Sequence, residues 1–101
     1  MPKELKTLEN YRVIAEEVKK IVTEFDPQAE VYVFGSVVRG NYTVASDIDI
    51  LVITEKTDKK YEIMTRVYRS IDAPIELHIV TKKLYEGWYK RFIKEHELLK
   101  I

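Results

Sequence analysis

Apolar residues recur every three or four positions in the first quarter of the chain, with charged residues between them. This spacing predicts a helix, which should end near Asp26 because the residue before Pro27 is biased out of helical geometry. The positions that carry the pattern are Leu5, Leu8, Tyr11 or Arg12, Ala15, Val18, Ile21, Val22 and Phe25. Residues 30–34 (EVYVF) and 47–54 (DIDILVIT) are rich in β-branched side chains and predict two strands. The second is apolar on both faces in its later half, which is typical of a central strand.

The second half of the chain predicts a helix, a strand and a last helix. Residues 61–71 fit a helix with one stripe formed by Tyr61, Met64, Tyr68 and Ile71. Pro74 precedes a strand at residues 75–80 (IELHIV), and Thr81 is placed to cap the last helix. The apolar residues of that helix are Leu84, Tyr85, Trp88, Phe92 and Ile93. Trp88 and the seven tyrosines are assigned to the core and to interfaces, because their spacing does not suggest base stacking.

This order of elements predicts an α/β (α+β) fold in which helices flank a small mixed sheet. A helix between the second and third strands is the arrangement of a right-handed parallel crossover. The first two strands are joined by only a dozen residues and could run antiparallel. Since 101 residues suffice for one core but not for two, residues 1–101 are treated as a single domain.

Composition excludes several classes of site and partner. Hydrophobic residues make up 46% of the chain and charged residues 34%, the balance of a soluble folded protein. Its 17 basic and 17 acidic residues cancel, which argues against nucleic acid as the main substrate. Without cysteine, neither a disulfide nor a thiolate zinc site can form. The sequence has no apolar run long enough for a membrane span and no secretory signal at its start, so we expect a cytoplasmic location.

Two aspartates stand at the start of an otherwise apolar strand, which is an unfavourable place for like charges. Asp47 and Asp49 would lie about 6–7 Å apart on one strand face. At an effective dielectric constant of about 20 they would repel by roughly 2–3 kcal/mol. With the strand directions above, Glu76 in the third strand lies at the same edge of the sheet. A divalent cation with oxygen ligands would compensate these charges, and Mg²⁺ keeps positions open for substrate phosphates.

A glycine–serine turn after the first strand supplies a candidate phosphate site at the same edge. Gly35 allows the backbone to approach a ligand closely. Ser36 can begin a short helical turn that runs through Arg39 and stops at Gly40. Free N–H groups at such a turn bind phosphate, and Arg39 could pair with a phosphate or with a carboxylate.

Simpler interpretations of these residues stay open. The glycine–serine pair could be an ordinary turn, and Arg39 could be a surface charge or a structural partner of Asp49. Glu76 could belong to a solvated strand face. His78 lies two residues after Glu76 and would share its face, but it is left outside the predicted site because a lone histidine on a strand is more often structural.

Residues 35–40 (GSVVRG) and 46–50 (SDIDI) together resemble the motif of the DNA polymerase β-like nucleotidyltransferase superfamily. The short chain is similar to its minimal members, the MntA-type antitoxins of HEPN/MNT modules. The resemblance implies a mixed sheet with flanking helices and a two-metal mechanism. Asp47 and Asp49 would hold two Mg²⁺ ions, and Glu76 would bind one of them and help to deprotonate an acceptor hydroxyl. These three carboxylates are therefore the expected catalytic and metal-binding residues.

The resemblance also implies a substrate, a reaction and a partner. Gly35 and Ser36 would hold the β- and γ-phosphates of a nucleoside triphosphate, taken as ATP, with Arg39 nearby. Attack on the α-phosphate would transfer AMP and release pyrophosphate. The expected acceptor is a tyrosine hydroxyl of a helical HEPN-family toxin, which the chain would silence as an antitoxin. A binding antitoxin without turnover, and an enzyme that nucleotidylates a small molecule, stay open as alternatives, as do the nucleotide preference and self-association.

Overall fold

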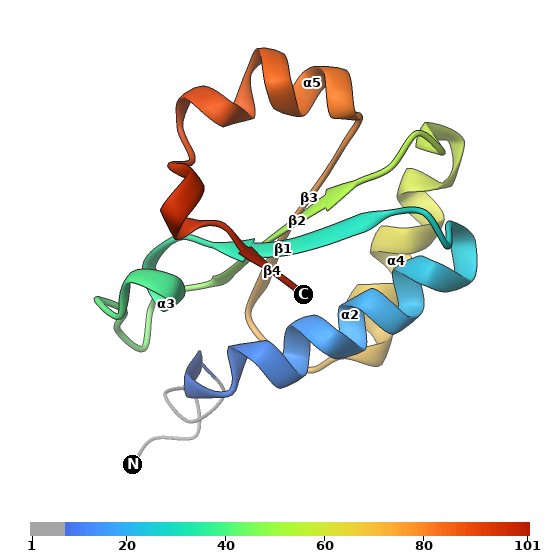
Figure 1. Cartoon of the computed structure of the whole chain (residues 1–101). Helices are drawn as coiled ribbons and strands as arrows, with labels where there is room; N and C mark the ends of the chain where they lie inside the picture. Colours follow the sequence, from blue (N-terminus) through green and yellow to red (C-terminus); the bar gives the residue numbers. More distant parts are fainter. Residues whose placement is uncertain (1–7) are drawn as a thin grey trace.

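A four-stranded mixed sheet forms the centre of the structure, a computed structural model that describes residues 8–101 (Figure 1). The strands are β1 (Glu30–Phe34), β2 (Ile48–Ile53), β3 (Ile75–Val80) and β4 (Leu99–Lys100). They lie in the order β3-β2-β1-β4, with β1 antiparallel to β2 and β4, and β2 parallel to β3. The predicted fold class, a mixed sheet flanked by helices, and both predicted strand directions are confirmed.

Helices cover both faces of this sheet. The main helices are α2 (Tyr11–Phe25), α3 (Ser36–Arg39), α4 (Lys60–Ser70) and α5 (Lys82–Gly87). Three 3₁₀ helices are η1 (Thr57–Lys59), η2 (Tyr89–Arg91) and η3 (Glu95–Glu97). Figure 1 shows α2 and α4 on one side of the sheet and the segment from α5 to η3 on the other. Within residues 8–101, no helix combines the length and the apolar character that a membrane crossing requires.

The alternation of side chains along β2 divides the core between these two layers. Ile48, Ile50 and Val52 join the larger apolar cluster, which α2 and α4 cover. Leu51 and Ile53 point the other way, into a smaller cluster formed with the segment after α5. β2 is therefore buried on both faces, as predicted for a central strand. Burial of each such side chain contributes about 1.5–3 kcal/mol.

The first helix follows its predicted course from Tyr11 onward, but a turn at Asn10 separates it from the helical residues 8–9, which the pattern had placed in the same helix. α2 ends at Phe25, and the N–H of Asp26 donates to the carbonyl of Val22 (2.9 Å). Leu8 is fully buried in the larger cluster. Leu5, which the helical pattern included, lies outside the described residues.

The predicted stripe of α4 is partly wrong. Its fully buried residues are Ile63 and Val67, whereas Tyr61 and Tyr68 are exposed. Both pairs have helical spacing, so periodicity alone does not choose between them. The aliphatic pair packs in the core because it has no polar atom to satisfy, while a tyrosine hydroxyl is best placed where it finds a partner.

The last predicted helix is shorter than expected. Thr81 caps α5 as predicted, its Oγ1 accepting a hydrogen bond from the N–H of Leu84 (3.1 Å). The α-helix ends at Gly87, a residue with low helix propensity, and the chain continues through η2 and η3 to β4. β4 was not predicted, because two residues are too few to show an alternating pattern.

A buried hydrogen bond joins the end of α2 to the end of β2. The Asp26 carboxylate accepts from Thr54 Oγ1 (2.5 Å) and from the N–H of Gln28 (3.0 Å). The Thr54 hydrogen bond lowers the pKa of Asp26 against the opposing effect of burial, and the Gln28 N–H adds to the lowering. Asp26 and Thr54 are both buried, so their hydrogen bond joins the segment after α2 to the segment after β2 beside the core.

Thr54→Val should reduce the free energy of unfolding by about 1–3 kcal/mol at pH 7, because the Asp26 carboxylate then has one donor fewer. Since the pKa of Asp26 is lower in the folded state than in the unfolded state, this stabilisation is present above the unfolded pKa. It is lost as the pH falls through the folded pKa. Urea unfolding of both proteins at pH 7 and at about pH 3 checks this; an equal difference at both pH values would contradict it.

Candidate active site

Gly35 follows β1 in a backbone conformation that favours glycine, with φ of 86° and ψ of −158°. Phe34 pairs with Asp49 across β1 and β2, so the next residue lies close to the Asp49 side chain. A Cβ atom at position 35 would collide with Oδ2 of Asp49. Only glycine leaves room for this carboxylate against the backbone. The sequence predicted a close approach to a ligand at this turn, whereas the group that lies against Gly35 in the structure is the Asp49 side chain.

The predicted helical turn after Gly35 is confirmed. The N–H groups of Val38 and Arg39 both donate to the Gly35 carbonyl (3.2 Å each), and the N–H of Gly40 donates to the Ser36 carbonyl (2.9 Å). Gly40 adopts the left-handed conformation (φ 81°) and ends α3. These hydrogen bonds hold the turn at both ends, and they place Ser36 at the start of α3, directly after the glycine that lies against Asp49.

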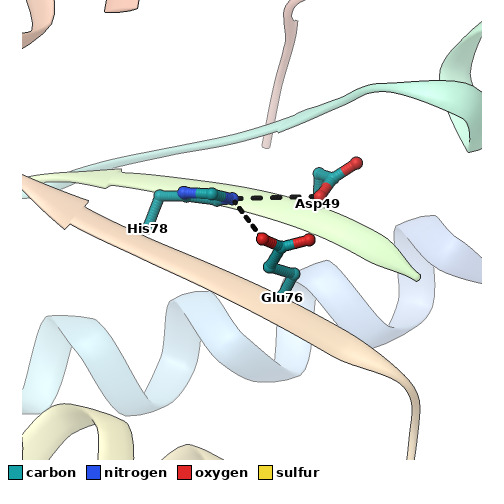
Figure 2. Close-up of side chains that lie close together, drawn as sticks. All are labelled: Asp49, Glu76 and His78. Carbon is teal, nitrogen blue, oxygen red and sulfur yellow. Dashed lines mark ion pairs between the residues drawn. The ribbon is translucent and has the colours of Figure 1, made fainter.

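Asp49 and Glu76 lie side by side on the sheet face opposite to α2 and α4 (Figure 2). They are direct neighbours in the parallel register of β2 and β3. His78 approaches both carboxylates, with Nε2 at 3.8 Å from Asp49 Oδ1 and 3.7 Å from Glu76 Oε1. One ligand atom from each of the three residues lies within 4.8 Å of the others. The structure therefore brings two of the three predicted carboxylates together, and adds a histidine.

The prediction left His78 out, although the sequence carried a signal for it. Residues two apart on a strand share a face, so His78 follows Glu76 onto the same side of β3. The sequence did not show that Asp49 lies beside His78, because this depends on the register between β2 and β3. That register pairs His78 with Leu51, two residues after Asp49. A histidine on an isolated strand has no such carboxylate to approach.

Asp47 lies one residue before β2 and is exposed. It is not among the three residues whose ligand atoms cluster, but its charge is close enough to contribute to a raised pKa of Glu76. The N–H of Ile48 donates to the carbonyl of Pro74 (2.7 Å), which ties the start of β2 to the segment before Glu76. Asp47 therefore lies at the rim of the site. Its role as a catalytic and metal-binding residue stays a prediction.

Arg39 pairs with a carboxylate, but not with Asp49. Its guanidinium lies 3.7 Å from Glu97 in η3, and both side chains are partly exposed. The simpler interpretation, in which Asp49 is the structural partner of Arg39, is therefore not supported among the described residues. Asp49 instead faces His78 and the turn at Gly35.

A cavity of about 410 Å³ opens between the glycine–serine turn and the C-terminal segment. Gly35, Ser36 and Asp49 line one part of it. Trp88 and Phe92 line another, with ring centroids 5.2 Å apart, and the two side chains are 54% and 67% exposed. Of the two places that the sequence allowed for Trp88, the core and an interface, the structure excludes the core, because the chain turns after Gly87 and leaves the indole exposed at the cavity.

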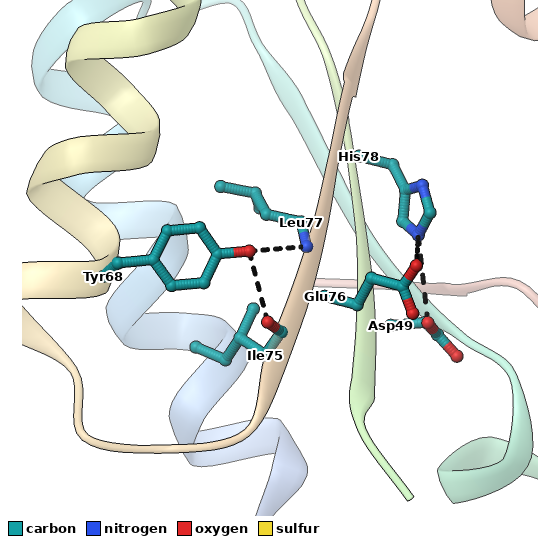
Figure 3. Close-up of polar contacts among 6 residues, drawn as sticks. All are labelled: Asp49, Tyr68, Ile75, Glu76, Leu77 and His78. Carbon is teal, nitrogen blue, oxygen red and sulfur yellow. Dashed lines mark hydrogen bonds and ion pairs between the residues drawn. The ribbon is translucent and has the colours of Figure 1, made fainter.

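Tyr68 forms hydrogen bonds with the backbone of β3, the strand that carries Glu76 (Figure 3). Its hydroxyl donates to the carbonyl of Ile75 (3.2 Å) and accepts from the N–H of Leu77 (3.1 Å). These two residues flank Glu76, and β3 is an edge strand whose outer groups no other strand pairs among residues 8–101. The tyrosine that periodicity assigned to the buried stripe thus holds the backbone on both sides of a site residue.

The pKa of the Glu76 carboxyl is raised, first by the hydrogen bond that its protonated form can share with Asp49. Burial and the negative charges of Asp49 and Asp47 act in the same direction, while His78 opposes them. The raised pKa shows that ionising all of these carboxylates is unfavourable without added positive charge. This is the electrostatic situation that a bound cation relieves.

Residues 15–101 match the family described as the nucleotidyltransferase domain. The chain belongs to this family. Among solved structures, this nucleotidyltransferase domain is similar to a provisionally assigned nucleotidyltransferase with 34% sequence identity and a TM-score of 0.68, covering 85% of this chain and 95% of the other. A second provisionally assigned nucleotidyltransferase, from Sulfolobus solfataricus, has 25% identity and a TM-score of 0.63 over 99% and 86% of the two chains. No curated protein matches significantly.

Nucleotidyltransferases generally use divalent metal ions, and the described residues fit one. Asp49 and Glu76 offer the oxygen ligands that Mg²⁺ prefers. Gly35 leaves the room that the Asp49 carboxylate occupies, and His78 Nε2 is buried without a hydrogen-bond partner among residues 8–101. The unsatisfied nitrogen lies 3.8 Å from Asp49 Oδ1 and 3.7 Å from Glu76 Oε1, so all three side chains face the place that a cation would take.

Gly35→Ala should destabilise the fold by about 1–3 kcal/mol, because its backbone conformation is almost restricted to glycine. It should also weaken divalent-cation binding, since the added methyl group displaces the Asp49 carboxylate. Urea unfolding and calorimetric titration with Mn²⁺ measure the two effects.

The matched control is Gly40→Ala. Gly40 also has a positive φ, but beyond the adjacent backbone no heavy atom lies within 4 Å of the position that an added methyl group would take there. It should lose stability by about 1 kcal/mol from strain alone and keep its affinity for the cation. Equal loss of cation binding in both variants would refute the role given to Gly35.

Asp49→Asn, in EDTA, should leave the fold intact and raise the free energy of unfolding at pH 7 by up to about 1 kcal/mol, an amount limited by the exposure of Glu76. The folded pKa of Glu76 is above its ordinary value of 4.5, so ionisation of Glu76 opposes folding as the pH rises through that pKa. The gain should therefore be absent at about pH 4. Thermal melts at both pH values test this, and a large loss at pH 7 would show that Asp49 is a structural partner.

Proposed function

We propose that this domain is a Mg²⁺-dependent nucleotidyltransferase that moves AMP from ATP to a hydroxyl group of a protein partner. The observation that carries the proposal is the position of Asp49, whose carboxylate lies against Gly35 and lines the same cavity as Ser36. Phosphates held at the glycine–serine turn would therefore lie beside the carboxylates. The cavity volume of about 410 Å³ is within the range of about 300–1,000 Å³ for small-molecule sites.

The binding roles follow from these positions. Gly35 and Ser36 hold the β- and γ-phosphates through backbone N–H groups and the serine hydroxyl. Arg39 lines the cavity and adds positive charge beside them. Two Mg²⁺ ions, when bound, supply charge neutralisation at the phosphates and make the acceptor hydroxyl more acidic. Their proposed ligands are Asp47, Asp49 and Glu76.

The reaction is an in-line displacement at phosphorus. The acceptor oxygen forms a bond to the α-phosphorus while the bond from that phosphorus to the α,β-bridging oxygen breaks. The electron pair of the broken bond leaves with pyrophosphate. The proton of the acceptor hydroxyl passes to the Glu76 carboxylate, whose side chain is 57% exposed and so can be reached from solvent.

The proposed acceptor is a tyrosine of a helical HEPN-type toxin, which the domain would silence as its antitoxin. The resemblance to minimal nucleotidyltransferases of HEPN/MNT modules suggests this partner. Exposed apolar side chains beside the cavity support a protein acceptor, because such patches mark interaction sites. Trp88 and Phe92 form this patch, with ring centroids 5.2 Å apart, and both line the cavity.

The test mixes the purified domain with the product of its neighbouring gene, ATP and Mg²⁺. Intact-mass and peptide mass spectrometry should show one added AMP on a tyrosine of that partner, with pyrophosphate released. No modification with any nucleoside triphosphate, despite a stable complex, would overturn the proposal.

Asp49→Ala separates catalysis from steric blocking. This variant should lose transfer by about a hundred- to a thousandfold, the scale of other lost electrostatic contributions to transition states. Asp58→Ala, which removes an exposed carboxylate from η1, is the matched control and should transfer AMP normally. If Asp49→Ala still neutralises the toxin as well as the wild type does, the domain acts by binding alone.

A further inference from the structure

His78 has no part in the reaction proposed above, yet its ring points into the site. Nε2 is buried and has no hydrogen-bond partner among residues 8–101. Figure 2 shows this atom directed at the carboxylates of Asp49 and Glu76. Leaving a buried polar nitrogen unpaired is unfavourable, so the arrangement indicates that another group satisfies it in the working protein.

Packing fixes the direction of this ring. Phe34 lies against it with centroids 5.4 Å apart, and Tyr89 contacts it edge-on with centroids 5.9 Å apart. The side chain is only 23% exposed. A ring held between two aromatic neighbours keeps Nε2 aimed at the carboxylates without needing a hydrogen bond from them.

The distances fit a shared cation better than direct hydrogen bonds. Nε2 lies 3.8 Å from Asp49 Oδ1 and 3.7 Å from Glu76 Oε1, beyond the usual N–H···O range of about 2.7–3.2 Å. Nitrogen and oxygen ligands lie about 2.0–2.2 Å from a transition-metal ion, so two ligands of one ion can be up to about 4.4 Å apart. Both observed distances fall within that span.

We propose that His78 directly ligates the divalent cation held by Asp49 and Glu76, and that it makes this site prefer Mn²⁺ over Mg²⁺. Imidazole nitrogen suits first-row transition ions, whereas Mg²⁺ favours a shell of oxygen ligands. Mn²⁺ accepts both kinds of ligand, so it gains from His78 while Mg²⁺ gains little. The inference rests on the cation site of the proposed function, where Mg²⁺ would support transfer but bind less tightly than Mn²⁺.

The experiment uses the whole chain with Mn²⁺ alone, and needs no nucleotide or partner. Electron spin-echo envelope modulation of the bound Mn²⁺ should show a directly coordinated ¹⁴N nucleus. Titration of the same sample with Mg²⁺ should show Mn²⁺ bound at least tenfold more tightly. Mn²⁺ bound without ¹⁴N coupling would overturn the proposal, and this measurement on the wild type does not depend on the folding of any variant.

His78→Phe removes the nitrogen and keeps an aromatic ring between Phe34 and Tyr89. It should lose the ¹⁴N coupling and raise the Kd for Mn²⁺ by at least about tenfold, a typical loss for a weakened metal site, while the Kd for Mg²⁺ changes less than about threefold. His96→Phe is the matched control, because His96 is 77% exposed and outside the cluster. It should keep the coupling and both affinities.

Asp49→Asn distinguishes failure of this inference from failure of the proposed function. If Asp49→Asn abolishes Mn²⁺ binding but the wild type shows no ¹⁴N coupling, the cation site stands and His78 is not a ligand. If the wild type binds no Mn²⁺ at all, both proposals fall. An unchanged Mn²⁺ to Mg²⁺ preference in His78→Phe also refutes the role of His78.

Discussion

The side-by-side register of Asp49 and Glu76 is the constraint on which the site depends. β2 lies between β1 and β3, and its apolar side chains are buried on both faces. The backbone of Asp49 cannot move away from that of Glu76 unless the centre of the sheet moves with it. The fold therefore keeps the two carboxylates close enough to repel each other, and Gly35 leaves the room in which the Asp49 carboxylate lies. Like charges held in this way favour a cation between them, and nucleotidyltransferases generally use divalent metal ions.

Much of the fold could be predicted because local patterns and connectivity agreed. A helix between β2 and β3 enforces a parallel crossover, and Pro27 limits α2. The buried side of α4 could not be predicted, because Ile63 and Val67 have the same helical spacing as the tyrosines and only packing distinguishes them. The position of β4 depends on where the preceding segment returns to β1, which is a tertiary property of the chain.

The candidate site was predictable in the places where a residue breaks a local rule. Asp49 stands in a strand that is otherwise apolar, and Gly35 is followed by a serine at the end of another strand. His78 and Trp88 break no such rule, since a histidine on a strand and a tryptophan on a helix are ordinary. Their importance comes from their neighbours: the register places His78 beside Asp49, and the end of α5 leaves Trp88 at the cavity.

The hydroxyl of Tyr68 also affects whether the sheets of two copies of the chain can pair edge to edge. β3 is at the border of the sheet, where outward-facing peptide groups can recruit a strand from a second copy and start aggregation. Tyr68 occupies the Ile75 carbonyl and the Leu77 N–H, so an incoming strand would have to displace a phenol that already satisfies both groups. The Tyr68 side chain thereby protects the exposed edge of the sheet. Glu76 on β3 can stay accessible to ligands without β3 becoming a template for fibre growth.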